Sequence, residues 1–242
     1  MRVLIAVVLC LVTGLSWSAD YVREKKWADE ITPGIVVGDP VYLTQKNGHK
    51  FLAIFTETEG AKLGVIVVHG LGIHPDWGMV GTLRTRLADD GYTTLSIQMP
   101  VLGINAKTED YNATMPEAAE RLQLAADFLK SKGFKKIAVV SHSMGSRMSN
   151  YYLSRHPDPG IVAWAALGIP GPGNYSKMKF PILDLYGQND MPIVLKDVKH
   201  RAASLTGHPG SKQEMIPNTD HFYANHEDDM VRAVKDFLDS IK

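Results

Sequence analysis

One serine in a run of small residues is the first feature of this sequence that could carry chemistry. Ser143 is the centre of SHSMG (residues 141–145), which follows an apolar run ending near Val140 and precedes a segment of helical spacing. A sharp strand-to-helix turn with small residues two before and two after the serine presents its hydroxyl as a nucleophile. Ser141 stands where glycine is usual, and a serine is small enough for the turn. We interpret Ser143 as a nucleophile, the alternative being a helix cap.

A serine hydroxyl attacks a carbonyl only with help, because a neutral imidazole must take its proton and a carboxylate must orient that imidazole. His221 lies in a loop after the apolar run near Met215 and before the last helical segment. Asp190 follows directly after the apolar run that ends at Tyr186. The chain order Ser143, Asp190, His221 is the one used by nucleophiles on this kind of turn. We expect these residues to be nucleophile, acid and base.

Four other residues compete for the roles of base and acid. His226 lies at the start of the last helix, where the helix dipole disfavours an imidazolium, and His142 adjoins the nucleophile and is expected to point elsewhere. Asp184 is embedded in a strand and needs a partner to offset its burial. Asp220 lies on the wrong side of His221 for an easy approach, so it is the weaker candidate.

Two backbone N–H groups are candidates for holding an oxyanion. The turn after Ser143 aims the N–H of Met144 into the site. The run HGLG (residues 69–72) follows a strand, and its glycines allow a close backbone approach, which makes Leu71 the second candidate donor. The alternative for this run is an ordinary glycine-rich turn.

Neither a cofactor nor a metal is expected. His69, His74 and Asp76 could be imagined as ligands, but their spacing fits no helical ligand pair. Asp76 is expected instead to cap a helix that carries Leu83 and Leu87. The Gly- and Pro-rich run at 168–173 lacks the lysine and the spacing of a phosphate-binding loop and is read as a turn beside the site.

The elements that position these residues alternate between apolar runs and amphipathic segments, which is typical of a parallel sheet covered on both faces. Asn47-Gly48 predicts a type I′ turn between two antiparallel strands. A capping box at Thr114 with Pro116 predicts the start of a helix, and the last helix carries Met230, Val234, Phe237 and Ile241 on one face. The expected strands are Val41–Thr44, Phe51–Thr56, Gly64–Val68, Thr93–Ile97, Lys136–Val140, Ile161–Leu167, Phe180–Tyr186 and Gln213–Ile216.

This pattern predicts an α/β fold with a mostly parallel, doubly wound sheet, an N-terminal antiparallel hairpin and no substantial cap domain. Three segments, at 65–72, 74–77 and 91–96, resemble a largely uncharacterised bacterial family of exported α/β-hydrolase-like proteins. The resemblance extends roughly from Gly64 to the C-terminus. It implies the α/β-hydrolase fold and the same three residues Ser143, Asp190 and His221, but it implies no substrate.

The N-terminus reads as an export signal, with Arg2 followed by an apolar run from Val3 to Val12 and small residues before a cleavage point. Cleavage after Ser18 is favoured over cleavage after Ala19. The apolar run is shorter than the ~20 residues of a spanning helix, so we expect an exported protein, periplasmic or secreted, with no stable membrane insertion after signal removal. The only cysteine, Cys10, would leave with the signal. The expected divisions are a signal (1–18), a lead-in (19–34) and a hydrolase domain (35–242).

The composition argues against polyanion binding. Lys plus Arg and Asp plus Glu both total 26, so the formal net charge is zero, and no nucleic-acid partner is expected. The leading hypothesis is a serine hydrolase that cleaves an ester or related acyl compound of small size through an acyl-enzyme on Ser143. Alternatives are a noncatalytic binding protein on the same fold, or a peptidase or acyltransferase using the same residues. The sequence leaves the oligomeric state open.

Overall fold

The structure is a computed structural model, and it describes residues 19–173 and 175–241. The expected export signal, with Cys10 and the favoured cleavage point after Ser18, lies outside the described residues. Among the described helices, none combines the length and apolar character that crossing a membrane requires.

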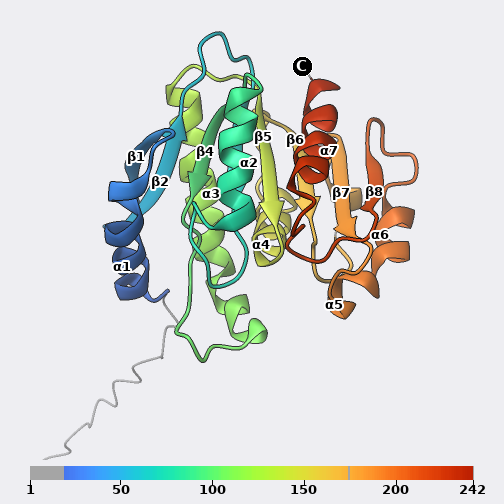
Figure 1. The fold of residues 1–242 in the computed structure, drawn as a ribbon, viewed down its shortest axis with the longest axis horizontal. Coiled ribbons are helices and arrows are strands. Elements are labelled where there is room, and N and C mark those ends of the chain that lie inside the picture. The colour runs from blue at the N-terminus through green and yellow to red at the C-terminus, as the bar shows by residue number, and fades with distance from the viewer. Residues whose placement is uncertain (1–18, 174, 242) are drawn as a thin grey trace, which may run out of the picture.

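The described residues form one eight-stranded sheet in the order β1-β2-β4-β3-β5-β6-β7-β8 (Figure 1). The pairs β1/β2 and β2/β4 are antiparallel, and all other neighbours are parallel. The strands are β1 (Asp39–Thr44), β2 (Lys50–Thr56), β3 (Gly64–Val68), β4 (Thr93–Ile97), β5 (Ile137–His142), β6 (Ile161–Leu167), β7 (Ile182–Gly187) and β8 (Lys212–Ile216). The predicted mostly parallel sheet with an N-terminal antiparallel hairpin is confirmed.

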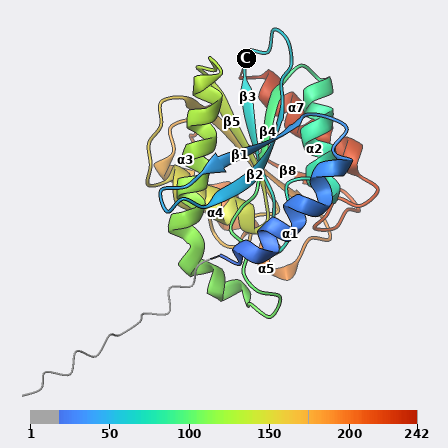
Figure 2. The same cartoon turned by 90° about the vertical axis from the view of Figure 1, so that its left-hand side faces the viewer.

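Helices cover both faces of the sheet (Figure 2). The α-helices are α1 (Tyr21–Ile31), α2 (Gly78–Asp89), α3 (Met115–Ser131), α4 (Met144–Leu153), α5 (Pro192–Leu195), α6 (Val198–Ser204) and α7 (Glu227–Asp239), and 3₁₀ turns span Thr32–Gly34, Thr108–Thr114 and Tyr175–Lys177. Helices α3 and α4 pack into one apolar core, and α2 and α7 pack into a second core on the opposite face. The described residues contain no large cap over the sheet.

The central strands are buried on both faces, which is why they are almost uninterrupted apolar runs. Every residue of β3, β4 and β5 is buried. The expected bounds of β3, β4 and β6 match those observed, and β5 runs on to His142, two residues beyond the expected end. Because parallel strands start from the same edge, the residues after β5, β7 and β8 meet at the opposite edge, which is the lower side of Figure 1.

The hairpin between β1 and β2 forms as expected, but its turn type differs. The N–H of Gly48 donates to the carbonyl of Gln45 at 2.9 Å, and Gly48 has a φ of +86°. A type I′ turn needs positive φ at both central residues, and Asn47 is not among the residues with positive φ. The type I′ prediction was therefore wrong: the turn is one residue longer, and only its glycine is left-handed.

Two expected helix caps are also corrected. Helix α3 begins after Thr114 as predicted, but the Thr114 hydroxyl donates to the carbonyl of Tyr111 rather than capping the helix. Asp76 does not cap α2; its carboxylate accepts from Arg84 of that helix at 2.6 Å. In both cases a side chain that could cap a helix has a stronger or nearer partner.

Candidate active site

The turn from β5 to α4 holds Ser143 in a backbone conformation that side chains rarely adopt. Ser143 has φ 53° and ψ −121°, and its N–H donates to the carbonyl of Leu167 at 2.9 Å. Gly145, two residues on, allows α4 to approach the end of β3, since a Cβ there would lie 2.2 Å from the His69 carbonyl oxygen. The conformation projects the Ser143 hydroxyl from the sheet edge.

Ser141 shows why a serine can replace the usual glycine at the first small position. Its side chain is buried, and its hydroxyl oxygen accepts from the indole N–H of Trp164 at 2.8 Å. The same hydroxyl lies 3.1 Å from that of Ser146. The extra oxygen is thus hydrogen-bonded inside the core, so its burial is compensated.

The structure brings Ser143, His221 and Asp190 into one hydrogen-bonded line. His221 Nε2 lies 2.8 Å from the Ser143 hydroxyl oxygen, and His221 Nδ1 lies 2.6 Å from Asp190 Oδ1. A carboxylate only accepts, so Nδ1–H donates to Asp190 and Nε2 is left to accept the serine proton. This is the arrangement in which an imidazole can act as a general base towards a serine.

Backbone groups fix the acid and the base in this line. The N–H of Met191 donates to Asp190 Oδ1 at 2.7 Å, and Asp190 and His221 are each only 4% exposed. Tyr223, two residues after His221, is buried, and its hydroxyl donates to the carbonyl of Leu185 at 3.1 Å. The loop that carries the imidazole is therefore anchored to β7, the strand that precedes the acid.

The competing residues have other partners. Asp184 is fully buried and accepts from Arg201 Nε at 2.9 Å, so it has the partner that its burial requires. His226 is the residue before α7 and lies 2.9 Å from Asp229. Asp220 accepts from backbone N–H groups of its own loop. None of them takes part in the line at Ser143.

His142 is closer to the site than the sequence suggested. Its Nε2 lies 2.9 Å from the His221 carbonyl oxygen, so Nε2 donates and Nδ1 is the bare nitrogen. Nδ1 is buried without a hydrogen-bond partner. The ring lines the same cavity as Ser143, and it packs against the His221 ring with centroids 4.6 Å apart. Sequence patterning gave no signal for this packing.

A cavity of about 280 Å³ opens at Ser143. Apart from Ser143, Thr108 and the two histidines, its wall is built from apolar side chains and glycine, and it carries no acidic or basic side chain other than the histidines. The lining residues are Gly70, Leu71, Ile73, Trp77, Thr108, His142, Ser143, Met144, Pro170, Met191, Ile193, Val194, His221 and Phe222. Both expected oxyanion donors, Leu71 and Met144, lie in this wall, as does Pro170 of the Gly- and Pro-rich turn.

Hydrogen bonds of the buried His69 ring hold the loop that carries Leu71. The Nδ1–H of His69 donates to the Gly70 carbonyl at 2.7 Å, and Nε2 accepts from the N–H of Met99 at 2.8 Å. Burial lowers the pKa of His69 to about 3, and burial together with the neighbouring His221 lowers the pKa of His142 to about 3. Both rings are neutral near neutral pH, so they shape the site without adding charge.

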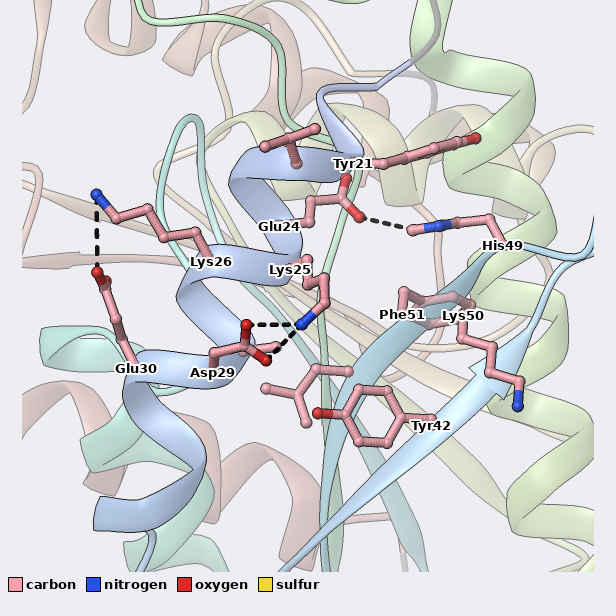
Figure 3. Close-up of a pocket in the computed structure, with 13 residues that line it drawn as sticks. Tyr21, Glu24, Lys25, Lys26, Asp29, Glu30, Tyr42, His49, Lys50 and Phe51 are labelled. Carbon is pink, nitrogen blue, oxygen red and sulfur yellow. Dashed lines mark hydrogen bonds and ion pairs between the residues drawn. The ribbon is translucent and has the colours of Figure 1, made fainter.

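A larger cavity, about 850 Å³, lies between α1 and the β1–β2 hairpin (Figure 3). Most of its charged side chains pair with one another: Glu24 lies 3.2 Å from His49, and Lys25 lies 2.7 Å from Asp29. Ser143 is not part of its wall. This cavity is therefore separate from the hydrogen-bonded line of Ser143, His221 and Asp190.

No group of three potential metal-ligating side chains gathers within residues 19–173 and 175–241. The three residues weighed as ligands have other contacts. His69 bonds to backbone atoms, Asp76 pairs with Arg84, and His74 accepts from the N–H of Asp76 and packs edge-on against Trp27.

Solved structures of hydrolases share this architecture. The chain is similar to Est1E of Butyrivibrio proteoclasticus with bound ferulic acid (16% identity, 83% of this chain and 98% of that chain, TM-score 0.70). It is similar to a serine hydrolase without a lid from Xanthomonas campestris (16% identity, 85% and 95%, TM-score 0.68). It is also similar to a dienelactone hydrolase from Anabaena variabilis (17% identity, 84% and 96%, TM-score 0.68). These likenesses show the α/β-hydrolase fold.

Residues 39–120, from β1 into α3, match a family described as "Protein of unknown function (DUF3530)". Among curated proteins, human ABHD14B, described as a candidate protein-lysine deacylase, is 30% identical over 135 residues. That match spans 54% of this chain and 63% of the human protein.

Proposed function

We propose that this protein is a serine hydrolase that cleaves an ester or related acyl compound through an acyl-enzyme on Ser143. The single observation that carries the proposal is the line of hydrogen bonds, 2.8 Å from Ser143 to His221 and 2.6 Å from His221 to Asp190. The similar esterases and hydrolases support the same reaction class.

In this mechanism the Ser143 oxygen attacks the substrate carbonyl while His221 Nε2 takes the hydroxyl proton. The negative charge that develops on the carbonyl oxygen is held by the N–H groups of Met144 and Leu71. Met144 is the first residue of α4, so its N–H has no acceptor within the helix. His221 then protonates the leaving group, and a water activated by the same imidazole releases the acid and restores Ser143.

The wall of the cavity at Ser143 favours a short, uncharged acyl group. Its volume of about 280 Å³ is at the lower end of small-molecule sites. Ile73, Trp77 and Phe222 provide apolar surface for the acyl chain, and the rings of Trp77 and Phe222 pack edge to face with centroids 5.6 Å apart. We expect short acyl esters to be turned over faster than long ones.

A fluorophosphonate probe and the variant Ser143→Ala test the reaction. The native protein should be labelled at Ser143, and the variant should lose labelling and lower the turnover of short acyl esters by a factor of about 10⁴ or more. Undiminished turnover by Ser143→Ala would rule the nucleophile out. A folded native protein that reacts with no serine-directed probe would indicate a noncatalytic binding protein.

The likeness to ABHD14B gives one further acyl class to include in the assay. An acyl-lysine amide passes through the same acyl-enzyme as an ester, with an amine as the leaving group. Acyl-lysine peptides should therefore be compared with esters of the same acyl chain. We also propose that the protein is exported, which amino-terminal sequencing of the protein from a periplasmic or culture fraction would test by finding a start at Ala19.

A further inference from the structure

A second hollow, about 570 Å³, adjoins the cavity at Ser143. The two share Pro170 and Ile193, which form part of both walls. The second hollow, here named the basic groove, is lined by Asn112, Met115, Arg147, Asn150, Tyr151, Arg155, Ile169, Pro170, Gly171, Pro172, Gly173, Ile193 and Lys196. Three of these side chains are cations and none is a carboxylate.

The basic groove follows α4 away from the nucleophile. Arg147 is four residues after Ser143, or about 6 Å along the helix axis, and Arg155 lies just beyond the helix end, about 18 Å from Ser143 at the same rise per residue. Lys196 follows α5, which in Figure 1 lies at the same edge of the sheet as the start of α4. A substrate that is bound at Ser143 and extends along α4 can therefore reach these cations.

Neutral groups hold the two arginines in place without cancelling their charge. Arg147 donates to the Asn112 side-chain oxygen at 3.0 Å, and the Arg155 guanidinium lies 4.2 Å from the centre of the Tyr151 ring. Each guanidinium has five N–H donors in a planar fork that suits carboxylate and phosphate oxygens. Most of these donors remain available for a ligand.

Most other arginines of the described residues are paired with acids. Ion pairs of this kind join Arg84 to Asp76, Arg86 to Asp228, Arg121 to Glu24 and Glu117, Arg201 to Asp184, and Arg232 to Asp229. In the same part of the chain, Arg147, Arg155 and Lys196 form no ion pair with a carboxylate. Uncompensated positive charge is thus gathered in the groove beside the nucleophile, although the whole chain has a formal net charge of zero.

We propose that the basic groove binds an anionic group, a carboxylate or a phosphate, on the far end of the substrate whose carbonyl Ser143 attacks. This inference rests on the proposed hydrolase function and adds to it a substrate class. The short apolar cavity takes the uncharged part next to the scissile bond, and the groove takes the charge. A half-exposed cation stabilises an anion only modestly, so we expect Arg147, Arg155 and Lys196 to act together.

The test compares matched substrate pairs. Each pair consists of an ester with a terminal carboxylate or phosphate and its neutral isostere, with graded spacers on the acyl side or on the leaving-group side. In the native protein, kcat/KM should be higher for the anionic member of at least one series, and the preference should weaken when ionic strength rises from about 0.05 M to about 0.5 M. The carboxylate and phosphate series show which anion fits.

The double variant Arg147→Gln/Arg155→Gln should reduce that preference by about threefold for each arginine. Lys62 and Lys136, which precede β3 and β5 at the opposite edge of the sheet, give the matched control Lys62→Gln/Lys136→Gln, which makes the same change in net charge. The control should leave both the preference and the turnover of neutral esters unchanged.

Three outcomes would contradict the groove proposal or the proposed function. If the native protein turns over neutral esters but prefers no anionic member in any series, the groove proposal is wrong while the hydrolase stands. The groove proposal is also wrong if the preference for anionic esters survives in Arg147→Gln/Arg155→Gln. It is equally wrong if Lys62→Gln/Lys136→Gln loses that preference to the same extent. If the native protein turns over no ester and reacts with no serine-directed probe, the proposed function itself fails.

Discussion

At the scale of single residues, the candidate nucleophile is held in an unfavourable backbone conformation. A φ of 53° at Ser143 is strained for any residue with a Cβ, by roughly 1–3 kcal/mol. The strain persists because Leu167 fixes the Ser143 N–H and because Gly145 packs against the end of β3. The same turn places the Ser143 oxygen within hydrogen-bond distance of His221, so strain and proposed reactivity have one origin.

This strain predicts that glycine is more stable than alanine at position 143. Both Ser143→Gly and Ser143→Ala remove the hydroxyl, so both lose its hydrogen bond to His221. Glycine also removes the strain, and its extra flexibility in the unfolded chain offsets about 0.5–1 kcal/mol of that gain. We expect the free energy of unfolding, measured by urea denaturation, to be about 1 kcal/mol higher for the glycine variant than for the alanine variant. Equal stabilities would mean that the strain is no larger than the roughly 0.5–1 kcal/mol that the flexibility of glycine offsets.

At the scale of elements, α1 is attached to the domain by a buried ion pair. Glu24 is 3% exposed and accepts from Arg121 of α3 at 2.9 Å and from the N–H of Val101 at 3.2 Å. Burial raises the pKa of Glu24, although Arg121 and His49 oppose the rise. On the same helix, Arg23 donates to the Gly72 carbonyl, next to Leu71. Helix α1 is therefore a support for the loop at the site.

Removing this pair should destabilise the whole protein. Glu24→Ala leaves Arg121 buried with Glu117 as its remaining acid, so we expect a loss of about 3 kcal/mol in the free energy of unfolding, at the low end for breaking a buried pair. The control is Glu30→Ala on the same helix, whose exposed pair with Lys26 is expected to contribute less than about 0.5 kcal/mol. Urea denaturation of both variants measures the difference, and equal effects would contradict the role of burial.

The local parts of these elements were predictable from the sequence, and the long-range parts were not. The apolar runs of β3 and β4 identified strands to the residue because both faces are buried, and the order of Ser143, Asp190 and His221 predicted which residues meet. The contact of Glu24 with Arg121 spans 97 positions, and no local pattern indicates it. Likewise, Asp76 could cap a helix by its position, but it pairs instead with Arg84, eight residues further on.

At the scale of the whole molecule, the site is assembled from loops that separate parts of the chain contribute to one sheet edge. β5 leads into Ser143, β7 into Asp190 and β8 into His221, and parallel pairing brings these ends together. The basic groove could not be predicted in the same way, because Arg147 and Arg155 are ordinary polar positions on α4 and just after it, and only the fold places Lys196 in the same groove. The three residues of the proposed reaction could therefore be predicted from the sequence, whereas the groove depends on the fold.

Two neutral histidines buried beneath this edge make the stability of the whole molecule depend on pH. Burial lowers the pKa values of His69 and His142 to about 3, whereas an unfolded histidine titrates near 6.5. Between these values the unfolded chain binds more protons than the folded one, so stability falls as pH falls from about 6.5 towards 3. Each histidine should contribute a loss of about 2 kcal/mol between pH 7 and pH 5.

The variant His142→Gln tests this dependence, because a glutamine can still donate to the His221 carbonyl but does not titrate. Its free energy of unfolding, measured by urea denaturation across the pH range, should fall less steeply than that of the native protein, by about 2 kcal/mol between pH 7 and pH 5. His200→Gln, which replaces an exposed histidine of α6, is the matched control and should follow the native profile. A His142→Gln profile parallel to the native one would mean that the imidazole beside the candidate nucleophile becomes charged in the folded protein, and that the neutral, tightly packed site described above does not persist in mild acid.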